Sequence, residues 1–330
     1  MDAFDLSYQP SQLLGIPVAL VGAVFLSVGA QLQHHGVAKV EANAGHAESG
    51  LNMRQLGLLL ARPSWVIGTL LLGLAIVFQL VSLKLSPIIL VQPLGVVGLV
   101  ITSILNARVS GVKLNHQSVI AVTLCVSGVG AFVLLAAVFA RDLPVTSRAL
   151  VVILIILAVV LIAFGLLFAF LRHRFKAIMY IVGAGVLYGF VATLAKAVIK
   201  RIEAGQFEWI TAVCVIALIA AAAVGAYFVQ TAYSSGPPDL VIAGLTVVDP
   251  LIAVLIGMVI LGEAAAAPPW VLVIFGVAGA VAVWGVIGLA RYHPQVLSDS
   301  QDLGIPRGSG GGTTNPGAEE APGSEGPYRA

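Results

Sequence analysis

Residues 151–157 read VVILIIL and lie inside an apolar run that extends from residue 148 to residue 171. The apolar residues follow one another without the alternating polarity of a membrane β-strand. A helix needs about 20 such residues to cross the roughly 30 Å hydrocarbon core of a bilayer. This run therefore predicts a transmembrane helix, and we apply the same criterion of length and apolar character to the rest of the chain.

Eight further runs meet the same standard, which predicts an all-α polytopic membrane protein with about nine transmembrane helices. Strongly apolar runs separated by short polar segments are typical of such proteins. The nine expected spans are 14–34, 63–83, 87–109, 117–140, 148–171, 177–199, 208–232, 239–261 and 270–290.

The composition agrees with a lipid environment. Of the 330 residues, 59% are hydrophobic and 10% are charged, and the mean hydropathy is +1.03. A soluble domain carries about 25% charged residues, so a soluble enzyme and a disordered protein are excluded. The net charge of +2 also gives no reason to expect a nucleic-acid partner. No catalytic cluster, nucleotide loop or metal motif occurs, so we expect neither an enzyme nor a cofactor.

The polar segments divide the chain. We expect a short N-terminal segment, a first repeat with a 35–62 loop, a connecting span, a second repeat and a disordered tail. Nine Lys and Arg residues fall on one side of the membrane and five on the other, which favours an outside N-terminus and a cytoplasmic tail in the plasma membrane. The five segments are 1–13, 14–140, 148–171, 177–291 and 292–330.

An internal repeat links spans one to four with spans six to nine. The triplet 21–23 reads VGA, as does 182–184, and proline-leucine pairs occur at 93–94 and 250–251. Gln79 precedes Pro87 by eight residues, as Gln230 precedes Pro238. With span five as the connector, the second unit is inverted relative to the first, which is the arrangement of many secondary transporters.

Asp249 is the strongest candidate for a functional residue. It lies near the middle of the eighth span, where a charge costs at least about 2.5–3.5 kcal/mol on insertion scales. Pro250 removes a backbone hydrogen bond beside it. A carboxylate next to a broken helix could bind a cation, a proton or an amine. The alternative is a neutral, hydrogen-bonded Asp that fixes helix packing.

Several amides and tyrosines could line the same central site. Gln92 directly precedes Pro93, as Asp249 precedes Pro250. Paired polar residues at helix breaks in corresponding spans indicate a binding site. The alternative is packing and hydrogen bonding between helices. The further candidates are Gln31, Gln79, Gln230, Tyr188 and Tyr227 for binding, and Pro87, Pro93, Pro238 and Pro250 for helix breaks or gating.

Two charged residues lie near span ends. Lys196 is about one turn from the outer end of the sixth span, and the repeat pairs it with His35, which suggests related gating roles. The alternative is that Lys196 extends to the membrane interface. Glu263 follows the eighth span, and we expect it to contact water.

The eighth span resembles the EamA branch of the drug/metabolite transporter superfamily. The resemblance rests on the acidic-proline step at 249–250 and the Gly-Glu pair at 262–263, 13 residues after Pro250. The first half looks more like the NIPA-type magnesium transporters, on Trp65, Gly68 and Pro87, the run LVQPLG at 90–95 and KLN at 113–115.

The resemblance covers about residues 13–290. NIPA-type proteins carry an acidic residue where this chain has Val112, so magnesium specificity does not follow from the resemblance. The superfamily usually has ten spans, and nine are proposed for its NIPA-like members. The whole chain looks most like the alanine-, valine- and leucine-rich integral membrane proteins of actinobacteria such as mycobacteria.

Together these features predict a secondary transporter of a small solute: a metabolite, an amine, an amino acid or a drug-like compound. Alternating access would occur around a central site near Asp249, with a proton or cation as a possible coupling ion and a homodimer as a possible assembly. The alternative is a pathway for magnesium or another divalent cation, with Asp249 as a metal ligand. A second alternative is a membrane scaffold that transports nothing.

Overall fold

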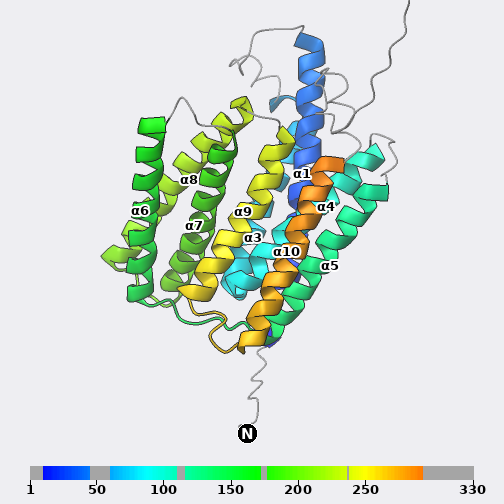
Figure 1. The fold of residues 1–330 in the computed structure, drawn as a ribbon. Coiled ribbons are helices and arrows are strands. Elements are labelled where there is room, and N and C mark those ends of the chain that lie inside the picture. The colour runs from blue at the N-terminus through cyan, green and yellow to red at the C-terminus, as the bar shows by residue number, and fades with distance from the viewer. Residues whose placement is uncertain (1–9, 45–59, 110–115, 172–176, 236–237, 293–330) are drawn as a thin grey trace, which may run out of the picture.

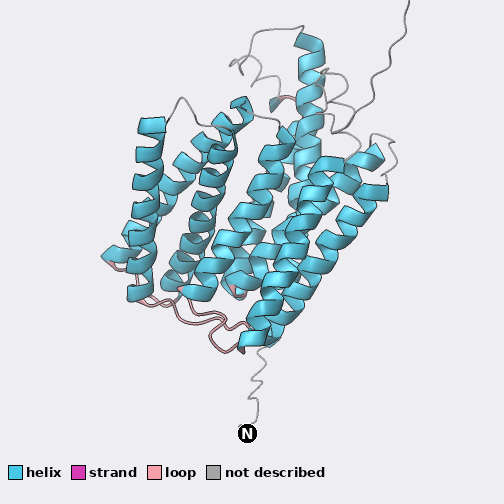
Figure 2. Ribbon diagram, viewed as in Figure 1, coloured by secondary structure: helices cyan, strands magenta, loops and turns pink. Residues whose placement is uncertain are grey.

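The computed structural model describes residues 10–44, 60–109, 116–171, 177–235 and 238–292, and within these ranges the regular structure is helical (Figure 2). The helices, in chain order, are η1 (Pro10–Leu13), α1 (Gly15–Ala44), α3 (Pro63–Leu85), α4 (Ile88–Val109), α5 (His116–Phe139), α6 (Ser147–Leu171), α7 (Ala177–Glu203), α8 (Trp209–Ser235), α9 (Pro238–Val259) and α10 (Pro269–Tyr292).

Nine of the described helices are long and apolar enough to cross a membrane, as the sequence predicts. The chain is therefore a multi-pass membrane protein, for which the bilayer is the solvent. The expected 35–62 loop is wrong at its start, because α1 continues to Ala44. The expected tail lies outside the described residues from position 293 onward.

The helices pack in a pattern that pairs the two halves of the chain. Helix α1 packs against α3 and α4, and α7 packs in the same way against α8 and α9. Between the halves, α4 contacts α9 and α5 contacts α10. Helix α6 lies at one edge of the bundle and contacts α7 and α8 (Figure 1).

Small residues let the crossing helices approach closely. A Cβ atom at Gly128 of α5 would lie 2.9 Å from the backbone oxygen of Ala278, and one at Gly285 of α10 would lie 2.7 Å from the Cα of Cys125. Gly185 and Gly189 of α7 meet α9 in the same way. Glycine four residues apart is a common device for close helix contact in lipid, where packing drives association.

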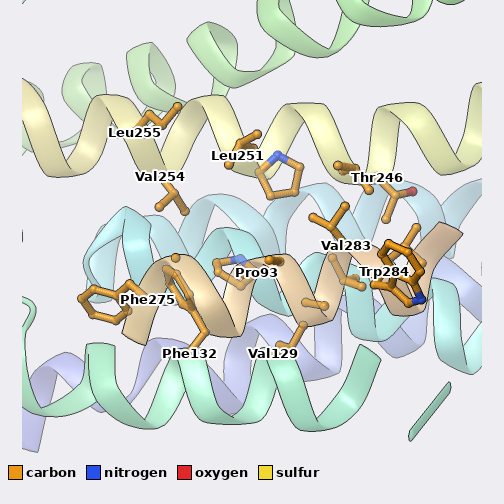
Figure 3. A pocket seen from close by; sticks show the side chains of 18 of the residues that line it. Pro93, Val129, Phe132, Thr246, Leu251, Val254, Leu255, Phe275, Val283 and Trp284 are labelled. Atoms are coloured by element: carbon orange, nitrogen blue, oxygen red, sulfur yellow. The ribbon is translucent and has the colours of Figure 1, made fainter. Parts of the chain in front are cut away.

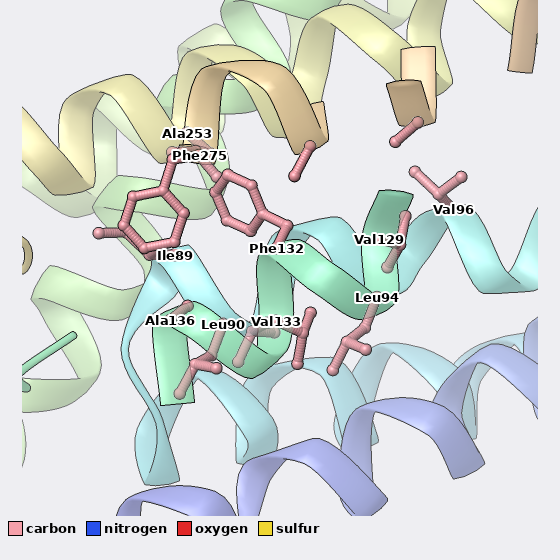
Figure 4. Packing of buried hydrophobic residues seen from close by; sticks show 14 of the residues in the cluster. Ile89, Leu90, Leu94, Val96, Val129, Phe132, Val133, Ala136, Ala253 and Phe275 are labelled. Atoms are coloured by element: carbon pink, nitrogen blue, oxygen red, sulfur yellow. The ribbon is translucent and has the colours of Figure 1, made fainter. Parts of the chain in front are cut away.

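The interior is apolar on both sides of the α4–α9 contact. In the larger cluster, Ile89 of α4, Phe132 of α5 and Phe275 of α10 lie together (Figure 4), with the two rings 4.7 Å apart between centroids. A second cluster joins α6, α7 and α8 around Leu187 and Leu194. The bundle therefore has a packed interior although most outward side chains are also apolar, as a lipid-facing surface requires.

One end of the bundle is defined by η1 and by the connections 86–87, 140–146, 204–208 and 260–268. They gather at the lower end of Figure 1, which we call the η1 end. Here the Ser82 hydroxyl donates to the Gly15 carbonyl at 2.8 Å, and the Gly15 N–H donates to Ser86 Oγ at 3.1 Å. These bonds attach the start of α1 to the end of α3.

Candidate functional site

A cavity of about 620 Å³ lies between α4, α5, α9 and α10. Its walls come from both halves of the chain, and Figure 3 shows Pro93, Phe132 and Val254 turned toward the same space. The lining on α9 extends from Thr246 to Met258, which covers the middle of that span and the half nearer the η1 end. The volume is within the range of small-molecule sites, about 300–1,000 Å³.

Two of the predicted helix breaks meet at this cavity. Pro93 of α4 and Pro250 of α9 both line it, and both lie inside their helices. A proline within a helix lacks the N–H that would bond the carbonyl four residues earlier, which here belongs to Ile89 or Thr246. Pro87 lies just before α4 and is buried. Pro238 begins α9, and its side chain lies outside the described ones.

Asp249 lies beside the cavity without lining it. Helix α9 turns this residue toward α7, where it interacts electrostatically with Tyr188 and where Gly185 allows the two backbones to approach. The Asp249 Oδ1 atom is buried and has no hydrogen-bond partner among the described residues. A buried carboxylate oxygen without a partner is costly, so this position is not explained by packing alone.

The remaining polar candidates are spread over the bundle, and none of them lines the cavity. Gln92 is buried beside Pro93, whereas Gln31 and Gln79 are half-buried. Gln230 and Tyr227 are both exposed on α8, so neither is placed to line a central site. An apolar helix of this length has room for a polar side chain on its outer face, and the sequence does not say which face that is.

Lys196 is in the interior, so the predicted extension to the interface is wrong. Its residue surface is 1% exposed, and its Nζ donates to Glu263 Oε1 at 2.6 Å and to the Ser86 carbonyl at 3.0 Å. Asp142 Oδ1 lies 3.0 Å from the same nitrogen, and Asp142 Oδ2 lies 2.6 Å from Lys200 Nζ. We call these four charged side chains (Asp142, Lys196, Lys200 and Glu263) the end cluster.

Glu263 is also buried, at 1% exposure, so the expected contact with water is wrong. Its Oε1 and Oε2 atoms accept the backbone N–H groups of Ile88 and Ile89, each at 3.0 Å. These are unpaired donors at the first turn of α4, where the helix dipole also favours a negative charge. Gly262, with φ of 71°, turns the chain after α9 so that the carboxylate reaches this position.

The end cluster joins the two halves of the molecule. Its side chains come from the α5–α6 connection, α7 and the α9–α10 connection, and its backbone partners belong to the start of α4. The Arg141 N–H donates to the Glu263 carbonyl at 2.8 Å, which adds a backbone bond between the α5–α6 and α9–α10 connections. Buried charges with several partners hold one geometry, so the cluster ties the two halves together at the η1 end.

Two more ion pairs, each with an exposed carboxylate, surround this cluster. Lys84 at the end of α3 pairs with Glu203 of α7 at 2.8 Å, and Arg201 pairs with Glu208 at 3.0 Å and with the Ser147 hydroxyl at 3.1 Å. These contacts link α3, α6, α7 and α8 at the same end. The Lys84–Glu203 pair is exposed on both sides and is of the kind that contributes about 0–1 kcal/mol, whereas the Arg201 side chain is buried.

No group of three or more His, Cys, Asp or Glu side chains suited to a metal ion occurs in the part of the chain that the structure describes. The chain is 26% identical over 286 residues to an uncharacterized protein of Corynebacterium glutamicum, an alignment that covers 85% of this chain and 96% of the relative. No family model matches the chain, and no solved structure matches it.

Proposed function

We propose that the chain is a secondary transporter of a small solute, which binds in the middle of the membrane between the two halves of the molecule. The observation that carries this proposal is the cavity bounded by α4 and α5 on one side and by α9 and α10 on the other. Sites at the interface of two repeats, beside interrupted helices, are typical of secondary transporters.

The packing supports the proposal of an inverted repeat. The contacts of α1 with α3 and α4 correspond to those of α7 with α8 and α9, and α4 meets α9 where their prolines correspond. The start of α4 lies against the chain that follows α9, so these two helices run in opposite directions. Such a pattern also supports membership of the drug/metabolite transporter superfamily, which we retain as a proposal.

Alternating access requires one end to open while the other closes. In this arrangement the end cluster closes the η1 end below the cavity, because it ties the α9–α10 connection to the start of α4. We propose that these contacts separate when the solute enters or leaves at that end. The count of Lys and Arg favours the outer side of the plasma membrane for this end.

The alternative of a magnesium pathway has less support in the cavity. Hard cations bind several oxygen ligands, and the cavity offers one side-chain oxygen, from Thr246. The carboxylate of Asp249 lies on the α7 side of the same helix.

The proposal can be tested without knowing the solute. Single cysteines at Met258 and Thr246, in a chain with Cys125→Ala and Cys214→Ala, mark the cavity lining near the η1 end and far from it. A charged thiol reagent added at the η1 end reports whether that end is open. We expect Lys196→Met to raise the labelling rate at position 258 about tenfold or more, since each 1.4 kcal/mol changes a population ratio tenfold.

The matched control is Lys84→Met, which removes an exposed ion pair at the same end. At a temperature where the Lys196→Met variant remains folded, a transporter should show increased labelling at position 258 with Lys196→Met and little change with Lys84→Met. A rigid scaffold would show equal rates in all three backgrounds, and that result would refute the proposal. Flux assays in proteoliposomes with amines, amino acids, uncharged lipophilic dyes and Mg²⁺ would then identify the solute.

A further inference from the structure

The cavity between the two halves is lined almost entirely by apolar side chains. Twenty residues form its walls, and among them Thr246 and Trp284 are the only ones that carry a hydroxyl or an N–H group on the side chain. None of the twenty is charged. A charged or strongly polar group in this space would lose its hydration without gaining partners, which is expensive.

The nearest carboxylate does not change this character. Asp249 precedes Pro250, which lines the cavity, but its own side chain interacts with Tyr188 on the α7 side of the helix. The charged side chains of the end cluster likewise pair with one another and with backbone N–H groups at the start of α4. The space itself is therefore suited to hydrocarbon.

The cavity also reaches the lipid-facing surface. Four of its lining residues are 45% to 73% exposed: Leu251 and Leu255 on α9, and Leu272 and Trp284 on α10. In contrast, Phe132 of α5 is 7% exposed, which places it at the inner wall. The opening thus lies between α9 and α10, in the middle of the membrane-spanning region, where the surrounding medium is lipid.

We propose that this cavity binds the uncharged, apolar part of a lipophilic or amphipathic solute, which enters sideways from the bilayer between α9 and α10. The proposal rests on the proposed transporter function and names its substrate class. Burial of apolar surface stabilises such a complex. The Thr246 hydroxyl donates to the Ile242 carbonyl at 2.7 Å, so its oxygen can accept one hydrogen bond from the solute. A bilayer acyl chain shares this chemistry, so the test separates the two sources.

Two glycines make a direct test possible. Gly276 and Gly279 line the cavity, and a Cβ atom at either position would meet no other atom within 4 Å. Gly276→Leu and Gly279→Leu should therefore fill the space while leaving the fold intact. Gly73 and Gly165 are equally free of neighbours and lie on exposed faces of α3 and α6, away from the cavity, so Gly73→Leu and Gly165→Leu are matched controls.

The experiment is photolabelling of the full chain in nanodiscs with two probes, followed by mass spectrometry of the labelled peptides. One probe is an uncharged phenyl-diazirine solute, and the other is phosphatidylcholine with a diazirine in its acyl chain. We expect the solute probe to label cavity residues of α9 and α10. Labelling there should fall about tenfold or more in Gly276→Leu and Gly279→Leu and stay unchanged in both controls.

Other outcomes overturn the proposal. Labelling of the cavity by the phosphatidylcholine probe alone would mean that bilayer lipid fills it. Labelling by the solute probe that is the same in Gly276→Leu, Gly279→Leu and the unmodified protein would mean non-specific partition into lipid. Displacement of the lipid label by excess unlabelled solute would support the proposal.

Flux measurements separate this inference from the transporter function. Flux of a polar solute that is unaffected by Gly276→Leu would overturn the apolar site and keep the transporter. Photolabelling could instead be specific while the Met258→Cys thiol reacts equally with and without Lys196→Met or Lys84→Met. That result would support the apolar site and overturn the transporter function.

Discussion

Replacement of Lys196 by Met should be among the most destabilising single changes in this molecule. The ammonium group is buried and within 3.0 Å of oxygens from Glu263, Asp142 and Ser86. Met retains much of the apolar stem but removes the charge. Asp142 keeps Lys200 as a partner, whereas Glu263 remains buried with only two backbone N–H donors.

The expected cost follows from this asymmetry. Removal of one partner of a buried ion pair costs about 3–5 kcal/mol, because the remaining charge is left without compensation. The Lys84–Glu203 pair, with side chains 49% and 36% exposed, supplies the comparison. Lys84→Met should cost at most about 1 kcal/mol, the value for exposed pairs.

The assay is unfolding of the purified protein in a mixed-micelle titration with SDS, supported by a thermal melt followed by intrinsic fluorescence. The double variant Lys196→Met/Glu263→Gln removes both charges, and its loss should be smaller than the sum of the single losses by about 0.5–3 kcal/mol. If Lys196→Met unfolds as late as Lys84→Met, the end cluster does not stabilise this end and the reasoning is wrong.

A charge swap sharpens the same prediction. In a simple salt bridge, Lys196→Glu combined with Glu263→Lys would restore the interaction. Here residue 263 also accepts two N–H groups at the start of α4, where an ammonium can accept nothing and meets the positive end of the helix dipole. We therefore expect the swap to be no more stable than either single variant, and rescue by the swap would contradict the capping role of Glu263.

Three further predictions concern single residues. Asp249→Asn should leave the melting temperature unchanged or higher, because a carboxylate with an unpartnered buried oxygen is replaced by an uncharged amide. The same variant should abolish solute flux because it removes the charge beside the proline of α9, and flux equal to wild type would show that this carboxylate takes no part in transport. Gly262→Ala and Gly205→Ala should each cost about 1–2 kcal/mol in unfolding, since φ is 71° and 67°, but only the first should raise labelling of a cysteine at position 258 from the η1 end. Gly285→Leu should prevent folding or lower stability by about 1–3 kcal/mol in the SDS titration, because the backbone of α5 fills that space, while Gly276→Leu on the same helix should leave stability unchanged.

The spans could be predicted from the sequence because a physical length fixes them. Each needs about 20 apolar residues, and the observed helices begin and end within four residues of the expected limits, except at the end of α1. There the sequence predicted residue 34 and the helix ends at Ala44. Residues 35–44 include charged side chains, which end the apolar run. The length of an apolar run matches the part of a helix that lies in lipid, whereas the helix itself can continue into water because it needs only its backbone hydrogen bonds.

The polar residues were harder to place because their partners are distant in the chain. Glu263 is 175 positions from Ile88 and 174 positions from Ile89, the two residues of α4 that it contacts. Lys196 is 110 positions from Ser86. Sequence placed Lys196 and Glu263 each at a span end, with solvent as the expected neighbour. The topology alone gave a clue, since spans six and eight both finish at the same side of the membrane.

The Gly-Glu pair that follows α9 acquires a physical role from this contact. Gly262 permits the turn, and Glu263 then serves two demands at once: it accepts the free N–H groups of α4 and it neutralises a buried ammonium from α7. Either demand alone could be met by water at a helix end. Meeting both inside the protein requires the end of the second half to lie against the start of the first. A carboxylate with two such partners is therefore a contact between halves, and the same atoms that stabilise this end are those that must separate if the cavity is to open there.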